Sequence, residues 1–387
     1  MIGNLKDLIF QFSEWRRFSG SDERLRQIVF YSESPSYWPY FRSVAEALTN
    51  DQHKHISYLT SSRHDPILND PPKGVSSFYI GEGSMRTIVF TAMKAGLVVM
   101  TTPDIGKSYF PKSKYDVHYA YLPHNMTSSH MVFRKHAFDG FDTIFCVGPA
   151  QKMEHREAEK LYGLKPRNLV ESGYVKLDEI REKAKGLMPV QGGAAFKIVI
   201  APTWGDEGLF TYGCNDLIES PLDAGHTVIL RPHRNTEISE PALLENLQSR
   251  FGGHQEFLWA RDLPDGGVYY GAHALVTDWS GAAFTFALGL ERPVLFIDTP
   301  KKIKNPDFSL FPTAPLEVAL RKQVGDVLAP DRMADAPKIL AQLLTAPEAH
   351  AVRIAELRAE LCFRNGDSAS FTAQCLAEIS ERLSSSA

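Results

Sequence analysis

Short apolar runs alternate with amphipathic segments along most of the chain, which predicts strands and helices in alternation. In the first half, each apolar run ends in polar or turn-forming residues, as buried strands do where they enter a loop. These runs occupy residues 27–31, 57–60, 97–102, 119–122 and 143–147, with helical spacing over 40–48. Buried strands separated by helices are typical of a parallel sheet with crossover helices.

A second series of strand-like runs begins near residue 196. Its members are residues 196–203, 227–233, 274–278 and 293–298. Between the two series, the glycine- and proline-containing stretch 183–195 predicts a linker, and residues 331–384 have helical spacing with an interruption at 363–367. We therefore expect an α/β fold of two Rossmann-like, doubly wound domains that face a central cleft, residues 1–188 and 189–387, with helices at the C-terminal end.

Residues 4–18 form an amphipathic pattern of their own. Leu5, Leu8, Ile9, Phe12 and Trp15 fall at helical spacing, and basic residues lie close by. One interpretation is a helix that packs on its own domain. The other is an interfacial helix with its aromatic side chains among lipid headgroups, which would place the protein peripherally at a membrane.

Composition narrows the class of protein. The chain has 387 residues, 43% of them hydrophobic and 23% charged, and a formal net charge of -4, which argues against general nucleic-acid binding. No apolar run approaches the roughly 20 residues that cross a bilayer, and the N-terminal residues lack the order of a secretory signal. The four cysteines form no C-x-x-C pair, so we expect reduced thiols in a cytoplasmic protein, or one bound at the inner face of the cell membrane.

Several motifs of cofactor and metal chemistry are absent from the sequence. There is no G-x-x-x-x-G-K-[ST] loop, no complete G-x-G-x-x-G, no G-x-S-x-G, no D-x-D and no H-E-x-x-H. We therefore predict neither a catalytic metal nor a bound cofactor.

Phosphate-binding residue types recur where the strands of the second half end. They are Thr203, then Arg231, His233 and Arg234, then Thr277, Asp278, Ser280 and Gly281. Hydroxyl, guanidinium and imidazole groups, together with backbone N–H groups at the start of a helix, suit a diphosphate. The same residues are equally compatible with an ordinary helix N-cap and a solvated basic loop.

A histidine follows a strand in the first half as well. His124 comes directly after residues 119–122, and Lys107, His130 and Arg134 are among the basic residues in the surrounding stretch. A lone histidine more often has a structural role, but a basic neighbourhood suits an anionic acceptor.

The order of these motifs resembles that of the CDP-glycerol glycerophosphotransferases, which build phosphate-linked polymers on bacterial surfaces. Residues 201–206 read A-P-T-W-G-D, residues 231–233 R-P-H, residues 277–280 T-D-W-S, and residues 292–296 R-P-V-L-F. S-G-Y-V-K-L-D at 172–178 and N-G-D-S-A-S at 365–370 are similar to two further segments of the family. The resemblance covers roughly residues 120–375.

The resemblance implies a GT-B-like fold and a metal-independent transfer of a polyol phosphate. The donor would be CDP-linked, and the acceptor would be a hydroxyl of a cell-surface glycan or lipid-linked molecule, as in the synthesis of a teichoic-acid-like polymer or capsule. His124 matches the histidine proposed as general base, and His233 matches the one that contacts the donor phosphates. Thr277 and Ser280 match the hydroxyls that bind the diphosphate.

Two segments depart from the family pattern. The family loop W-H-G-T-P-x-K is P-H-N-M-T at 123–127, and T-D-Y-S-S is T-D-W-S-G at 277–281. These departures leave open whether the donor carries glycerol phosphate, ribitol phosphate or a sugar. The alternatives are a GT-B glycosyltransferase that uses a nucleotide sugar and a non-catalytic relative that binds a nucleotide or glycan.

Overall fold

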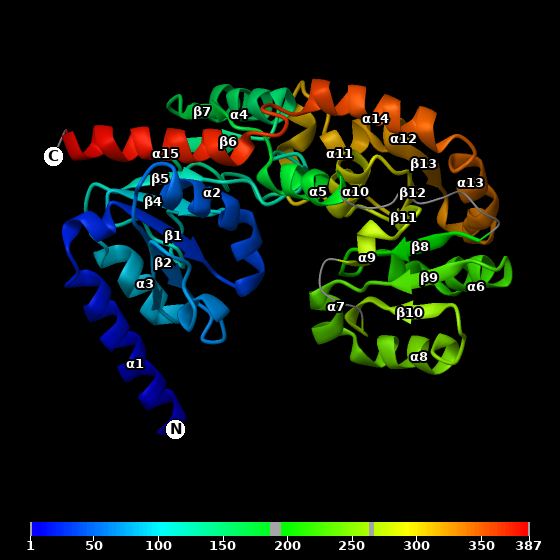
Figure 1. Cartoon of the computed structure of the whole chain (residues 1–387), viewed down its shortest axis with the longest axis horizontal. Coiled ribbons are helices and arrows are strands. Elements are labelled where there is room, and N and C mark those ends of the chain that lie inside the picture. Colours follow the sequence, from blue (N-terminus) through cyan, green and yellow to red (C-terminus); the bar gives the residue numbers. More distant parts are fainter. Residues whose placement is uncertain (1, 186–194, 263–266, 386–387) are drawn as a thin grey trace. The chain divides into compact units, whose positions relative to one another are not determined.

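The computed structural model describes residues 2–185, 195–262 and 267–385, which form two compact α/β units (Figure 1). The first unit comprises Met1–His124, Phe133–Asp178 and Leu361–Ala387, and the second comprises Asn125–Val132 and Glu179–Glu360. Each unit is built on one parallel sheet with helices packed against it. The predicted α/β class is thereby confirmed, while most of the expected linker at 183–195 lies outside the described residues.

The sheet of the first unit has seven parallel strands in the order β3-β2-β1-β4-β5-β6-β7. The strands are β1 (Ile28–Ser32), β2 (Ile56–Thr60), β3 (Val75–Tyr79), β4 (Leu97–Met100), β5 (His118–Tyr121), β6 (Thr143–Cys146) and β7 (Asn168–Glu171). The order reverses between β1 and β4, which pair in register from Ile28 opposite Leu97. In doubly wound sheets this switch point is where ligands bind.

Side chains of the central strand alternate between two buried faces. Val29 and Tyr31 belong to one apolar cluster, which includes Phe18 and Phe90 on helices. Ile28 and Phe30 belong to the cluster on the other face. Because successive side chains of a strand point to opposite faces, β1 is apolar throughout and both faces are covered by helices.

The helices of the first unit come from both ends of the chain. They are α1 (Ile2–Ser19), α2 (Trp38–Asn50), α3 (Gly83–Ala92), α4 (Pro149–Tyr162) and α15 (Ser368–Ser385), together with the start of α5 (Val175–Lys185). Figure 1 shows α15 running beside α2 over the sheet, and both helices contribute to the same apolar cluster. The expected division at residues 188 and 189 assigned this C-terminal segment to the second domain, whereas it packs in the first unit.

Asp178 explains how α15 is fixed there. Its carboxylate accepts hydrogen bonds from the backbone N–H groups of Gly366 at 2.9 Å and Ser368 at 3.0 Å, at the beginning of α15. Gly173 lies at φ +78°, and a Cβ atom there would be 2.3 Å from the carbonyl oxygen of Phe363. The two segments 172–178 and 365–370, far apart in the sequence, therefore form one close-packed junction.

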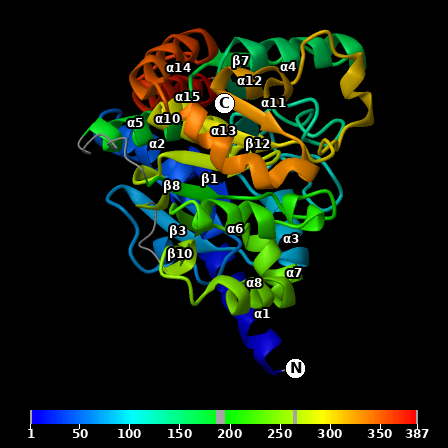
Figure 2. The ribbon, with the colours of Figure 1, turned by 90° about the vertical axis from the view of Figure 1, so that its right-hand side faces the viewer.

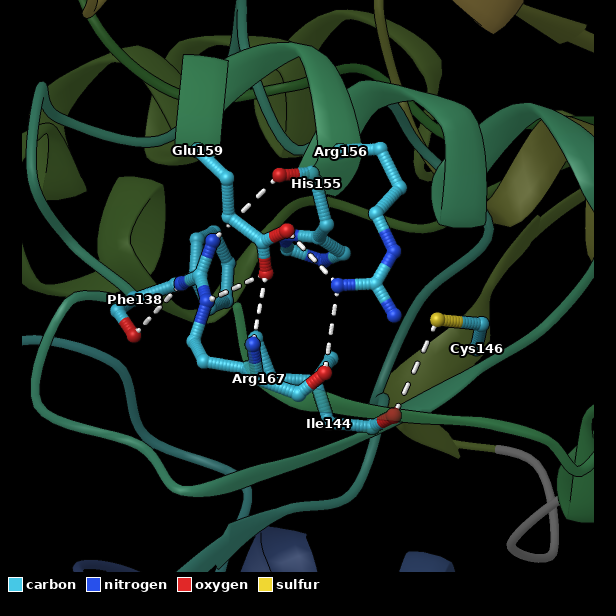
Figure 3. Close-up of polar contacts among 7 residues, drawn as sticks. All are labelled: Phe138, Ile144, Cys146, His155, Arg156, Glu159 and Arg167. Atoms are coloured by element: carbon cyan, nitrogen blue, oxygen red, sulfur yellow. Dashed lines mark hydrogen bonds and ion pairs between the residues drawn. The ribbon is translucent and has the colours of Figure 1, made fainter. Parts of the chain in front are cut away.

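A buried ion pair fastens α4 to the strand that follows it (Figure 3). The Glu159 carboxylate pairs with the buried guanidinium of Arg167 at 3.2 Å and accepts from the backbone N–H of Arg167 at 2.9 Å. It also accepts from the guanidinium of Arg156, on the same helix, at 2.6 Å. The Arg167 guanidinium also donates to the carbonyl oxygen of Phe138 at 3.0 Å. Burial alone would raise the pKa of Glu159, but the hydrogen bonds from Arg167 and Arg156 lower it below its ordinary value.

The sheet of the second unit has six parallel strands in the order β10-β9-β8-β11-β12-β13. The strands are β8 (Lys197–Ile200), β9 (Thr227–Leu230), β10 (Phe257–Trp259), β11 (Ala274–Thr277), β12 (Val294–Ile297) and β13 (Gly325–Leu328). The helices are α6 (Asn215–Asp223), α7 (Arg234–Ser239), α8 (Pro241–Phe251), α9 (Gly267–Tyr270), α10 (Ala282–Leu290), α11 (Leu316–Ala319), α12 (Arg321–Val324), α13 (Ala336–Leu343) and α14 (Pro347–Leu361). The switch point of this sheet lies between β8 and β11.

Helix α14 lies near α10 (Figure 2), and a hydrogen bond from Arg358 to Leu288 places it against the C-terminal end of that helix. The Arg358 guanidinium donates to the carbonyl oxygen of Leu288 at 2.7 Å and pairs with Glu291 at 2.8 Å. A cation among the last carbonyl groups of a helix is favourable because those groups carry partial negative charge. This contact holds α10, which begins at the switch point, in place from its far end.

Helix α1 exposes much of its apolar surface to solvent. Phe18 is fully buried against the sheet, while Leu8, Ile9 and Phe12 are 51 to 61% exposed. Figure 1 shows the first part of α1 projecting beyond the body of its unit. Among the helices of the described residues, none is long and apolar enough to span a membrane.

Candidate active site

The motifs predicted to bind a diphosphate meet at the switch point of the second sheet. Strands β8 and β11 are neighbours, paired from Ala274 opposite Ile198 to Val276 opposite Ile200. The loop after β8 carries Thr203, and the loop after β11 carries Asp278 and Ser280. Parallel strands present their carboxyl ends at the same edge, so these loops lie side by side.

Asp278 joins the two loops. Its carboxylate accepts from the Thr203 backbone N–H, the Thr203 hydroxyl and the Leu209 backbone N–H, each at 2.8 Å, and the side chain is fully buried. Thr203 and Asp278 were expected to contact a donor directly. In the structure the polar groups of Thr203 and Asp278 bond to each other, and this contact fixes the loop of residues 201–209.

The hydroxyl groups of Thr277 and Ser280 also bond within the protein. Thr277 is fully buried and its Oγ1 donates to the carbonyl oxygen of Ala201 at 2.6 Å. Ser280 Oγ accepts from the backbone N–H of Ala282 at 3.2 Å, at the start of α10. Gly281 is the N-cap residue of α10 and Ser280 precedes it, so the Ser280 hydroxyl closes a local turn ahead of the helix, and this edge of the sheet presents the N-terminus of α10 at Gly281.

His233 has a hydrogen-bond pattern that fixes its tautomer. Its Nδ1 accepts from the Asn235 backbone N–H at 3.0 Å, so in the neutral ring the hydrogen is on Nε2. Loss of hydration and the nearby cations Lys302 and Arg231 lower the pKa of His233 below its ordinary value. A neutral imidazole with Nε2–H is a donor that suits a phosphate oxygen. Arg234 follows as the first residue of α7 and is exposed.

Two residues that the sequence did not single out lie beside His233. The Trp204 ring is 6.1 Å from the His233 ring and 39% exposed. Lys302 places its Nζ atom 4.5 Å from the centre of the Trp204 ring. The sequence offered one signal for Lys302, the basic run 301–304, because this run follows a strand as the other predicted phosphate-binding residues do.

The segment that follows His124 packs inside the second unit. Ser128 donates from its backbone N–H and hydroxyl to the buried Glu317 carboxylate, at 2.8 and 2.7 Å. A Cβ atom on Gly281 would lie 3.2 Å from Thr127, so this segment contacts the start of α10. His130 is buried and stacks on Phe311 at 4.6 Å. His130 was expected on the acceptor side of the first domain, and the structure instead places it in the core of the second unit.

His124 itself lies in the first unit, directly after β5. Its Nδ1 is 2.9 Å from the carbonyl oxygen of Thr101. A carbonyl oxygen can only accept, so Nδ1 carries the hydrogen and Nε2 is the basic nitrogen of the neutral ring. The rings of Tyr37, Tyr40 and Phe133 surround the imidazole with centroid distances of 5.6 to 6.1 Å. In this tautomer the lone pair of the imidazole lies on Nε2.

Glu33 marks the switch point of the first sheet, where the sequence indicated only a loop. It follows β1, pairs with Arg86 at 2.8 Å and accepts from the hydroxyl of Thr102, after β4, at 3.3 Å. Burial raises the pKa of Glu33 above its ordinary value. A carboxylate at this position can bind hydroxyl groups. Of the two other basic residues expected on the acceptor side, Arg134 is exposed beside Asp104, and Lys107 forms an isolated bridge with Phe110.

The described residues contain no group of three or more histidine, cysteine, aspartate or glutamate side chains placed to hold a metal ion. The four cysteines form no disulfide, and Cys146, Cys214 and Cys362 are buried. Burial raises the pKa of the Cys146 and Cys214 thiols to about 12, so neither is a reactive thiolate.

Two Rossmann-like units, each built on one parallel sheet with a switch point, define a GT-B fold. Solved structures with this arrangement include the UDP-GlcNAc 2-epimerases of Methanocaldococcus jannaschii, in complex with UDP-GlcNAc and UDP, and of Neisseria meningitidis, bound to UDP-GlcNAc. Each is 12% identical to this chain, with a TM-score of 0.57, and the alignments cover 91% of this chain and 99% of the other. At this identity the likeness concerns the fold alone.

Comparison of the sequence with family patterns identifies the family. The pattern of the CDP-glycerol:poly(glycerophosphate) glycerophosphotransferase family matches residues 26–302, so the chain belongs to that family and is a transferase. No curated protein sequence matches the chain.

Proposed function

We propose that the protein transfers a polyol phosphate, such as glycerol phosphate, from a CDP-linked donor to a hydroxyl of a cell-surface glycan or lipid-linked acceptor. The product would be a phosphodiester of the kind found in teichoic-acid-like polymers and capsules. Membership of the family supports the reaction class. The second unit would bind the donor and the first unit the acceptor.

The opposite tautomers of two histidines are the observation that carries this proposal. His124 holds its hydrogen on Nδ1, which leaves Nε2 to accept a proton, whereas His233 accepts at Nδ1 and donates from Nε2. A phosphoryl transfer requires both functions, a base for the attacking hydroxyl and a donor to the charged phosphates. The backbone groups of Thr101 and Asn235 set these tautomers in advance.

The proposed reaction is a displacement at the phosphorus atom that carries the polyol. The acceptor oxygen forms a bond to that phosphorus while its proton passes to His124 Nε2. The bond from this phosphorus to the bridging oxygen breaks, and the electron pair leaves with CMP. His233 and Arg231, with the N-terminus of α10, would neutralise the charge that grows on the leaving group.

Replacement of each histidine by glutamine tests these roles. We expect His124→Gln to lower the turnover of CDP-glycerol about a hundredfold to ten thousandfold with little change in CDP affinity, because only the base is lost. His233→Gln should weaken CDP binding itself. Calorimetry measures the affinity and ³¹P NMR the phosphodiester, with the exposed His64→Gln as the matched control.

The same assays separate the alternatives. Near-normal turnover in His124→Gln would refute its assignment as the base. Tighter binding of UDP or GDP than of CDP, with a glycosidic product, would favour a nucleotide-sugar glycosyltransferase. CDP binding without turnover of any polyol donor would favour a non-catalytic relative.

We also propose that α1 contacts a membrane surface, where a lipid-linked acceptor resides. Four neighbouring side chains support this proposal, since Leu8, Ile9, Phe10 and Phe12 are 43 to 61% exposed on one short stretch of helix. Co-sedimentation with anionic phospholipid vesicles should be lost in Ile9→Glu. Ile238→Glu, at a site in the second unit that is 71% exposed, is the control and should leave it intact. Equal vesicle binding by both variants would exclude α1 as the contact.

A further inference from the structure

The loop after β12 is anchored so that it presents Lys302. The indole N–H of Trp279 donates to the carbonyl oxygen of Thr299 at 2.7 Å. The Arg321 guanidinium pairs with Asp298 at 2.6 Å and lies over the Trp279 ring at 4.1 Å. Trp279 belongs to the loop after β11, so the β11 loop holds the β12 loop directly. Lys302 is three residues beyond the Trp279 contact.

Lys302 reaches the end of β8 from this anchored loop. Its Nζ donates to the carbonyl oxygen of Trp204 at 2.7 Å and lies 4.5 Å from the centre of the Trp204 ring. The negative face of an indole attracts an ammonium group, so Trp204 fixes the position of the charge. The Trp204 ring also neighbours His233, at 6.1 Å. Three loops thus bring an ammonium, an indole and an imidazole to one edge of the second sheet.

Neither of two cations at this edge is paired with a carboxylate. Within the described part of the chain, Lys302 and Arg231 form no ion pair. The two acids whose charges act on Lys302 are Asp278 and Glu207, and the Asp278 carboxylate already accepts three hydrogen bonds within the protein. Burial, followed by the nearby Lys304, lowers the pKa of Lys302, which indicates mutual repulsion and incomplete hydration.

A multiply charged anion would relieve that repulsion. We infer that Lys302, positioned by Trp204, binds the diphosphate of a nucleoside diphosphate donor together with His233. This assignment rests on the proposed function and extends it by one substrate-binding residue. An ammonium at this place adds a second full positive charge to a site whose other donors are the Arg231 guanidinium, the His233 imidazole N–H and backbone groups. The diphosphate of the donor, rather than its base or its polyol, is the part that Lys302 recognises.

Calorimetric binding of CDP, CMP and inorganic pyrophosphate to the full-length protein tests the inference. We expect Lys302→Gln to weaken CDP and pyrophosphate binding about tenfold or more, because a hydrogen bond to a charged group is lost, and to affect CMP less. Lys301→Gln removes the same charge from the neighbouring exposed residue and should change the affinities less than twofold. Trp204→Leu should weaken pyrophosphate binding, and Trp204→Phe should retain most of it, since a ring remains.

The titration of His233 gives a readout that mere structural damage would not produce. Lys302 and Arg231 are the two cations that lower the pKa of His233, so Lys302→Gln should raise it in NMR titration, while Lys301→Gln should not. If wild-type protein binds CDP and Lys302→Gln binds CDP and pyrophosphate as tightly as Lys301→Gln, the inference is refuted and the proposed function stands. If wild-type protein binds no nucleoside diphosphate, the proposed function itself fails, and the inference with it.

Discussion

Replacement of Asp278 by asparagine measures how strongly one buried carboxylate holds together the loops after β8 and β11. Three donors converge on it at 2.8 Å, two from Thr203 and one from Leu209. An amide offers one acceptor oxygen, so in either orientation its NH₂ group faces a backbone N–H of Thr203 or Leu209. One charge-assisted bond is lost and one buried donor is left unsatisfied, which together cost roughly 3–4 kcal/mol of folding free energy.

Urea unfolding followed by tryptophan fluorescence measures this cost. With a slope of about 2–3 kcal/mol per molar urea, the midpoint for the second unit should fall by about 1–2 M. CDP affinity should fall as well, because the loop that carries Trp204 loses its anchor. Asp206→Asn, an exposed change in the same loop, is the control and should leave both quantities nearly unchanged. If the two variants unfold at the same urea concentration, the hydrogen bonds of Asp278 do not contribute the predicted free energy of folding.

Two further predictions concern the first unit. Gly173→Ala should destabilise it by about 3 kcal/mol or more, since the residue has φ +78° and the new Cβ would lie 2.3 Å from the Phe363 carbonyl oxygen. Gly163→Ala, at φ +64° with nothing within 4 Å, isolates the backbone contribution and should cost about 1–2 kcal/mol in the same urea assay; equal costs would exclude the clash. Glu159→Gln should destabilise the protein at pH 7 by about 2–3 kcal/mol. The folded-state pKa of Glu159 is lowered, so its stabilisation is present above the unfolded value near 4.5 and should vanish as the pH falls through the folded-state pKa; a difference that stays constant with pH would contradict this.

The interior strands could be predicted from the sequence, and the outer strands could not. The apolar runs identified at 27–31, 97–102, 196–203 and 274–278 became the central strands of the two sheets. The strands absent from that prediction, β3, β7, β10 and β13, all lie at the edges. An edge strand needs less apolar burial, as Ser76 in β3 and Asp326 in β13 illustrate, so its sequence lacks the continuous run.

The local sequence pattern also could not predict to which of the two units a segment belongs. The sequence predicted the helices of the C-terminal region and the break before α15, and the structure confirms both. That α15 packs in the first unit depends on Asp178, whose partners Gly366 and Ser368 follow it by almost 190 residues. Residues 125–132 belong to the second unit for a similar reason, because Ser128 bonds to Glu317.

By itself the sequence determined the α/β class, the family motifs and the edge of the second sheet at which the residues predicted to bind phosphate gather. Only the tertiary structure decided which of those groups face inward. The Asp278 carboxylate accepts from Thr203 and Leu209, and the Thr277 hydroxyl donates to Ala201. Lys302, by contrast, lies on a loop that contains none of the predicted motifs. A motif specifies residue types at strand ends, but a buried hydroxyl or carboxylate must first satisfy its own hydrogen bonds, and its partners are set by neighbouring strands.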